Sequence, residues 1–277
     1  MASPRIDEQI EGLARLGYAA RGVVYLVIGW FAVTAAQGHN RPTDSKGALA
    51  ELFGTSFGAV LLAVVALGLA GYALWRLVGA LADVDNEGTS AKGLAKRGGH
   101  VIAGIIHAGL ALYAVRLLAG SGGGQKDGET AARDWTVWLL DMPAGQLLVA
   151  AVGVIIGAFA VSQFIKAYRA DFLRTLSCDG RTARVVRPIG RAGLAARGVV
   201  FLVVGGFFVL AALHADSSEA GGMVKALRWL ETQPFGPWLL GAVAVGLAAF
   251  GLFSFVQAVY RRIDGKRAMQ RIDAAIA

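Results

Sequence analysis

The sequence predicts an all-α membrane protein in which six transmembrane helices form three parallel helical-hairpin repeats. Two observations carry this prediction: the chain has six long apolar runs, and the start of the first run returns twice. Of the 277 residues, 56% are hydrophobic and only 17% are charged, whereas a soluble domain carries about 25% charged residues. The mean hydropathy of +0.56 also favours a membrane protein.

Each apolar run is about 20 residues long, enough to cross about 30 Å of hydrocarbon as a helix. Helices are favoured because every backbone group in lipid needs a hydrogen-bond partner, which a single helical segment supplies by itself. The predicted spans are residues 17–37, 57–79, 99–119, 145–165, 193–213 and 235–259.

The repeated phrase is RLGYAARGVVYLVIG at residues 15–29, which returns as RAGLAARGVVFLVVG at 191–205 and, more loosely, as RGGHVIAGIIHAGLA at 97–111. Such self-similarity predicts a repeat protein. We therefore divide one membrane domain, residues 1–277, into three repeats. They cover residues 12–95, 96–180 and 187–265.

Within each repeat a short amphipathic stretch is expected between the two long helices, at residues 48–58, 136–146 and 225–236. All three hairpins would enter the membrane from the same side. Parallel repeats of this kind are related by an axis along the membrane normal, so we expect pseudo-threefold symmetry about that normal.

Positive charge predicts the orientation. Of the 27 Lys and Arg residues, 20 lie in the two terminal segments and in the segments 76–97 and 166–197. Because Lys and Arg concentrate on the cytoplasmic side, we expect both termini in the cytoplasm and a multi-pass protein of the bacterial inner membrane. The net charge of +8 is thereby explained without nucleic acid.

The first helices share a face of small residues with one larger side chain between them. The spacing i, i+3 and i+7 places each set on one side of a helix, and small residues permit close approach of another helix. We expect these faces to meet neighbouring helices, with Tyr25, His107 and Phe201 as candidate axis-lining residues in one layer. The sets are Gly22, Tyr25 and Gly29; Gly104, His107 and Ala111; and Gly198, Phe201 and Gly205.

Three phrases carry a resemblance to a known family: ARLGYAARGVVYLVIG at residues 14–29, GLAGYALWRL at 68–77 and QPFG at 233–236. With these phrases the chain resembles the bacterial DUF1206 family of integral membrane proteins over essentially its whole length. The resemblance implies three repeated pairs of transmembrane helices and no assigned activity. Repeat two departs from the pattern, because Ala103 stands where the other repeats have Arg21 and Arg197.

Arg21 and Arg197 lie about one turn inside the apolar boundary. One interpretation is a pair of cations that bind an anion or lipid headgroups in a cytoplasmic vestibule. The alternative is that both side chains snorkel to the interface and serve topology alone.

Polar residues within the runs are few. His107 lies near the middle of the third helix and could share a polar contact with Gln163, and Gln257 is a candidate interhelical hydrogen-bonding group. The single cysteine, Cys178, excludes an internal disulfide. No cluster of His, Cys, Asp or Glu predicts a metal, and no constellation predicts catalysis, so we expect no cofactor and no enzyme.

Two functions remain open at this point. The first is a structural or accessory protein that acts through helix–helix or lipid contacts, with a membrane-protein partner or a second copy of itself. The alternative is a small channel or transporter with its path along the pseudo-threefold axis. A filled axis favours the first hypothesis, and a continuous polar lumen favours the second.

Overall fold

A computed structural model describes residues 4–81, 83, 87–121 and 128–262. In these ranges the structure is helical, with six helices long and apolar enough to cross a membrane. The long helices are α1 (Pro4–Ala36), α3 (Gly58–Leu81), α4 (Ala91–Leu118), α6 (Gly145–Arg169), α7 (Gly180–His214) and α9 (Gly236–Tyr260). The expected all-α class and the six apolar spans are thus present.

The first helices of the repeats extend beyond the predicted spans into the basic segments that precede them. Pro4, Ala91 and Gly180 begin these helices, whereas hydropathy predicted starts at residues 17, 99 and 193. Hydropathy detects only the apolar part of a helix. The polar first turns are stabilised by caps, such as the Ser90 and Asp179 side chains, which accept backbone N–H groups of the first turn.

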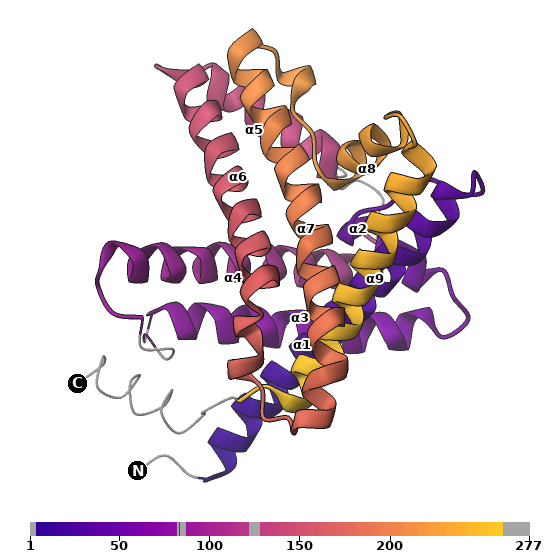
Figure 1. Cartoon of the computed structure of the whole chain (residues 1–277), viewed down its shortest axis with the longest axis vertical. Helices are drawn as coiled ribbons and strands as arrows, with labels where there is room; N and C mark the ends of the chain where they lie inside the picture. Colours follow the sequence, from indigo (N-terminus) through magenta and orange to yellow (C-terminus); the bar gives the residue numbers. More distant parts are fainter. Residues whose placement is uncertain (1–3, 82, 84–86, 122–127, 263–277) are drawn as a thin grey trace.

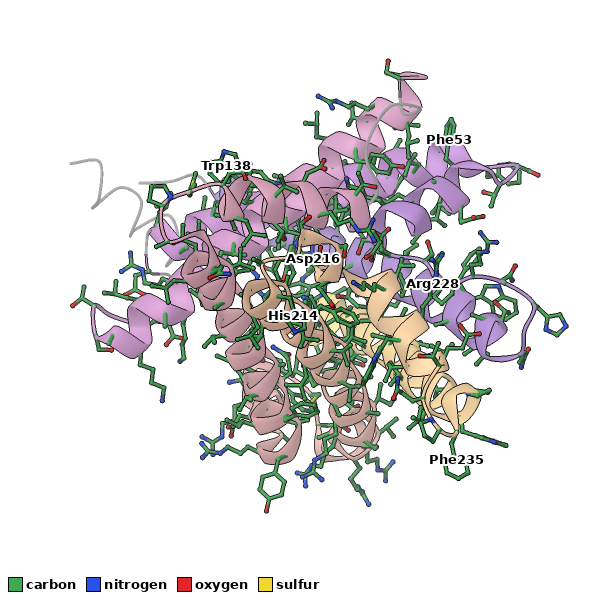
Figure 2. The ribbon with its side chains drawn as sticks, turned by 90° about the horizontal axis from the view of Figure 1, so that it is seen from above. Phe53, Trp138, His214, Asp216, Arg228 and Phe235 are labelled. Carbon is green, nitrogen blue, oxygen red and sulfur yellow. The ribbon has the colours of Figure 1, made fainter. Side chains whose placement is uncertain are left out.

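Each first helix is followed by a short helix, as expected for the amphipathic stretches. These are α2 (Ser45–Phe53), α5 (Gly128–Leu140) and α8 (Met223–Glu231). In α8, Ala226, Leu227 and Leu230 are buried while Trp229 is exposed, so one face packs on the long helices. Seen from above, Phe53 and Phe235 point outward from this layer (Figure 2). Two short 3-10 helices, η2 (Asp171–Thr175) and η3 (Ser217–Glu219), lie in connections.

The long helices pack mainly between repeats. The second helix of each repeat packs against the first helix of the next, and the series closes on itself, giving the pairs α3–α4, α6–α7 and α9–α1. In Figure 1 these three pairs run in three different directions. The strongest contacts therefore join consecutive repeats and join the last repeat to the first.

Packing within a repeat is present in two repeats and missing in one. The pairs α1–α3 and α7–α9 are packed, whereas α4 and α6 of repeat two are not among the packed pairs of the described chain. Correspondingly, 22% of the apolar window of α4 and of α6 is buried, against 50% or more in the other long helices. In the described chain, repeat two therefore lacks the packing between its two long helices that repeats one and three have.

Glycine permits the tight contacts between paired helices. A Cβ on Gly205 of α7 would lie 3.0 Å from the carbonyl oxygen of Gly153 on α6, and one on Gly29 of α1 would lie 2.8 Å from the backbone nitrogen of Ala248 on α9. Gly104 of α4 meets Leu77 and the Ala73 carbonyl on α3 in the same way. The small-residue faces meet neighbouring helices, as expected, and the neighbour is the second helix of the preceding repeat.

The apolar core is continuous from the short helices into the long ones. Ile28, Leu49, Leu62, Leu227 and Leu247 have no exposed surface, and they belong to one apolar cluster that joins the first and third repeats. Side chains thus fill the interior at this depth.

Candidate functional site

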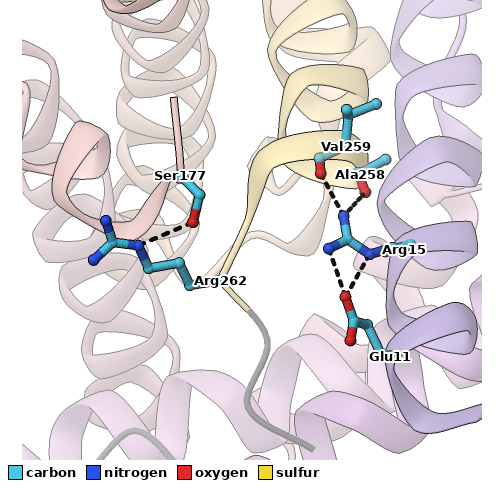
Figure 3. A network of polar contacts seen from close by, with 6 residues as sticks. All are labelled: Glu11, Arg15, Ser177, Ala258, Val259 and Arg262. Carbon is cyan, nitrogen blue, oxygen red and sulfur yellow. Dashed lines mark hydrogen bonds and ion pairs between the residues drawn. The ribbon is translucent and has the colours of Figure 1, made fainter. Parts of the chain in front are cut away.

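Three arginines at equivalent places in the repeats cap helix ends, a role that the sequence analysis did not assign. Arg15 donates to the Ala258 and Val259 carbonyls of α9 (Figure 3). Because the last four carbonyls of a helix lack partners within it, a guanidinium satisfies them well.

The same contact recurs in the other two repeats. Arg97 of α4 donates to the Ala80 and Leu81 carbonyls of α3, and Arg191 of α7 donates to the Ala167 carbonyl of α6 at 2.8 Å. Each arginine thus closes the last turn of the second helix of the preceding repeat. This cyclic relation was visible in the sequence only as a repeated basic residue before each apolar run.

A second set of contacts between the same helix pairs lies about two to three turns further into the helices. Tyr25 packs on Phe250 with centroids 4.7 Å apart, and Phe201 packs on Phe159 at 5.0 Å. In repeat two, the His107 ring lies 4.6 Å from the Tyr72 ring.

These three ring pairs have one design. Each joins the first helix of one repeat to the second helix of the preceding repeat, and no ring contact in the described chain joins Tyr25, His107 and Phe201 to one another. The ring contacts of the axis-lining candidates therefore run between neighbouring helices, and their arrangement in one layer stays a prediction. Their partners, Tyr72, Phe159 and Phe250, stand at the same distance from Gly58, Gly145 and Gly236 at the starts of the second helices.

Arg21 is buried among these rings and does not snorkel. Its side chain is 8% exposed. The Nε donates to Ser254 Oγ at 3.1 Å, one Nη donates to Tyr72 Oη at 2.9 Å, and the other donates to Gln257 Oε1. Arg21 therefore fastens α1 to both α3 and α9, and Gln257 has the interhelical role expected of it.

Arg197 occupies the equivalent place in α7 but has a different environment. Its guanidinium lies 4.3 Å from the Phe250 centroid and within 5.8 Å of the Tyr25, Phe159 and Phe201 centroids. Its Nε is buried and has no hydrogen-bond partner in the described chain. Four rings attract the cation through their π faces, whereas its Nε has no acceptor among the described residues.

The two arginines share one ring. Phe250 lies 5.0 Å from the Arg21 guanidinium and 4.3 Å from that of Arg197. Among the described residues neither arginine forms an ion pair, since the ion pairs found there involve other side chains. We call Arg21, Arg197, Tyr72, Phe159 and Phe250 the arginine–aromatic centre. In this centre two cations contact the same ring, and neither is paired with a carboxylate of the described chain.

Repeat two has no charged side chain at the position of Arg21 and Arg197. Ala103 stands in place of the arginine, and its carbonyl is 2.7 Å from His107 Nδ1. Gln163 of α6 is 3% exposed and makes only a long contact of 3.5 Å with Ser162 Oγ. The expected polar contact between His107 and Gln163 is therefore not found among the hydrogen bonds of the described residues.

A cavity of about 610 Å³ lies where the short helices meet. It is lined from all three repeats, including Asp44, Lys46, Glu129, Arg133 and Arg228. Both acids serve structure. Asp44 caps α2 through the Gly47 N–H, and Glu129 of α5 accepts the Gly222 and Lys225 N–H groups at the start of α8. This cavity lies in the layer of short helices, whereas Arg15, Arg97 and Arg191 lie at the opposite ends of the long helices.

These observations define a class: a multi-pass membrane protein made of three two-helix repeats that interlock in a cycle. The model of the family described as Domain of Unknown Function (DUF1206) matches the chain three times, at residues 16–83, 98–170 and 192–261, each inside one expected repeat. The chain belongs to this family, as the resemblance implied.

A relative in Bacillus subtilis (strain 168), the "Uncharacterized protein YxxB", is 33% identical over 261 residues. The match covers 93% of this chain and 94% of that protein. No solved structure matches. The family relation therefore establishes the kind of protein and assigns no activity.

Proposed function

We propose that this protein is a structural or accessory protein of the bacterial inner membrane that binds an anion at the arginine–aromatic centre. The observation that carries the proposal is the Arg197 guanidinium, which has a buried Nε without an acceptor beside a second arginine and no carboxylate. The Arg197 side chain as a whole is half-buried, but burial of its Nε–H without an acceptor is costly. An anion with phosphate-type oxygens would supply both the charge and the acceptors.

Three repeated features support a pseudo-threefold organisation around this centre: the arginine caps, the ring pairs and the cyclic helix pairs. We propose that a rotation relates the repeats and that repeat two deviates at Ala103. We place both termini in the cytoplasm because Lys and Arg concentrate in the segments on that side. The arginine–aromatic centre would then lie near the cytoplasmic face. Homo-oligomers and other membrane-protein partners remain compatible with this function.

The alternative function, a channel, has one observation in its favour, the cavity of about 610 Å³ lined by all three repeats. In the long helices, however, fully buried side chains such as Ile28 and Leu62 fill the interior. We therefore propose that the resting protein has no open path for ions and catalyses no reaction.

Proteoliposomes should show ion flux no higher than protein-free vesicles. Steady flux that requires the protein would favour the channel.

The binding proposal is tested with two probes, phosphatidylglycerol in neutral detergent micelles and soluble glycerol phosphate. The wild-type protein should bind at least one probe with one-to-one stoichiometry, measured by native mass spectrometry and calorimetry. Arg197→Gln should weaken that binding at least tenfold, because it removes a charge-assisted contact. Arg187→Gln changes an exposed arginine on the same helix and is the matched control. Absence of binding to either probe, or equal binding by Arg197→Gln, would overturn the proposal.

A further inference from the structure

Repeat two differs from its neighbours in two ways that coincide. It lacks the arginine, because Ala103 replaces it, and its two long helices, α4 and α6, are not packed together. In repeats one and three the arginine itself bridges the two helices. Arg21 of α1 donates to Tyr72 on α3 at 2.9 Å, and Arg197 of α7 lies 4.3 Å from Phe250 on α9.

The missing arginine explains why the cycle of packed helices is interrupted between α4 and α6. A methyl group at Ala103 is too short to span from α4 to Phe159 on α6, whereas a guanidinium on its long stem spans such a distance in the other repeats. Among the long helices of the described chain, neighbours in the cycle therefore pack on one another everywhere except at α4 and α6. On these two helices Ile105 and Ile155 are 61% exposed and Ile106 is 55% exposed, so α4 and α6 carry apolar surface that packing leaves uncovered.

From this arrangement we infer that the anion is the headgroup of an anionic membrane lipid, which enters the centre from the bilayer between α4 and α6. This inference rests on the proposed anion-binding function and names its ligand. The exposed isoleucines on α4 and α6 suit acyl chains, which require an apolar surface. Arg197 supplies the inner cation.

A further cation is carried by α6. Lys166 on α6 is exposed and lies one turn from the buried Gln163. A lipid phosphate bound at α6 would thus have Lys166 as a second cation beside Arg197. A soluble anion would gain nothing from the apolar surfaces that flank this entry, so the geometry favours a lipid over a free phosphate.

The first test places a large uncharged side chain at position 103, where the other repeats have arginine. Ala103→Phe in the full-length protein should lower phosphatidylglycerol binding at least tenfold in the native mass spectrometry assay. Gly109→Phe on the same helix, where a Cβ would meet nothing within 4 Å, is the control and should bind as the wild type does. Glycerol phosphate at millimolar concentration should not displace the lipid, and phosphatidylcholine should not bind.

Photocrosslinking covers the case in which Ala103→Phe fails to fold. A phosphatidylglycerol with a benzophenone in its acyl chain should label wild-type α4 and α6 and spare α1 and α9.

The outcomes separate the two proposals. If Arg197→Gln lowers binding while Ala103→Phe binds like the wild type, or if the label falls only on other helices, lateral entry is wrong and anion binding stands. If glycerol phosphate competes, the ligand is a soluble anion. If Arg197→Gln has no effect, the proposed function itself fails.

Discussion

At the scale of single residues, two arginines from the same place in two repeats have different chemistry. Arg21 uses all three guanidinium nitrogens, on Ser254, Tyr72 and Gln257, so its charge is fixed by neutral acceptors from two helices. Arg197 has rings around it and no acceptor for its buried Nε. Arg21 therefore joins helices through its hydrogen bonds, whereas Arg197 has a donor left to bind a ligand.

This contrast predicts opposite effects of one substitution. Arg21→Gln should lower the free energy of unfolding by about 2 kcal/mol, because buried acceptors lose charge-assisted donors. Arg197→Gln should change stability by less than about 0.5 kcal/mol in delipidated protein, because the lost cation–π attraction is offset by removal of a buried Nε that has no acceptor in the described chain. Thermal unfolding in one detergent compares the two variants directly. Equal losses of stability would show that both arginines are structural.

At the scale of helices, the molecule is held together by contacts that repeat around a cycle. Each first helix offers glycines and one capping arginine to the second helix of the preceding repeat, as Arg191 of α7 does to the Ala167 carbonyl of α6. A glycine lets the backbones approach, which maximises van der Waals contact where lipid gives no hydrophobic driving force.

Neighbouring glycines of α7 provide a matched test of this packing. A Cβ on Gly205 would lie 3.0 Å from Gly153 O, whereas one on Gly206 meets nothing within 4 Å. Gly205→Leu should therefore destabilise the protein by about 2 kcal/mol through overpacking, and Gly206→Leu should be neutral within about 0.5 kcal/mol. Chemical denaturation in mixed micelles measures both variants. The packing account is wrong if the two substitutions cost the same.

The arginine caps predict a second matched pair. Arg191→Met removes a donor to the last turn of α6 and should lower the stability of the α6–α7 contact by about 1 kcal/mol. Arg187→Met, one turn earlier and exposed, should have little effect. Hydrogen exchange at the C-terminal end of α6 should rise in the Arg191 variant only. Unchanged protection there would contradict the capping role.

At the scale of the whole molecule, the sequence predicted the class and the parts well. Six spans, three repeats and short amphipathic helices follow from hydropathy and self-similarity, because these properties are local. The partnership between repeats is a property of long-range contacts, so Arg15, Arg97 and Arg191 could be read only as topological charges. Tyr72, Phe159 and Phe250 looked like ordinary apolar residues, because a single aromatic in an apolar run carries no sign of its partner.

Orientation is the next whole-molecule prediction, and the single cysteine makes it simple to test. Cys178 lies in the connection between α6 and α7, which the charge bias places in the cytoplasm. A membrane-impermeant maleimide should label it only after the cells are opened. A Ser56→Cys variant made in a Cys178→Ser background, with its thiol between α2 and α3, should label in intact cells. Labelling of Cys178 in intact cells would reverse the proposed orientation.

The central claim is that the arginine–aromatic centre holds an anionic ligand. The measurement that tests it most directly is a high-resolution structure of the protein extracted with its native lipids. We expect a phosphate group within hydrogen-bonding distance of the Arg197 guanidinium, with acyl chains leading out between α4 and α6. A structure in which Arg197 is paired with a carboxylate of the chain itself, or hydrated by water alone at full lipid occupancy, would contradict the account.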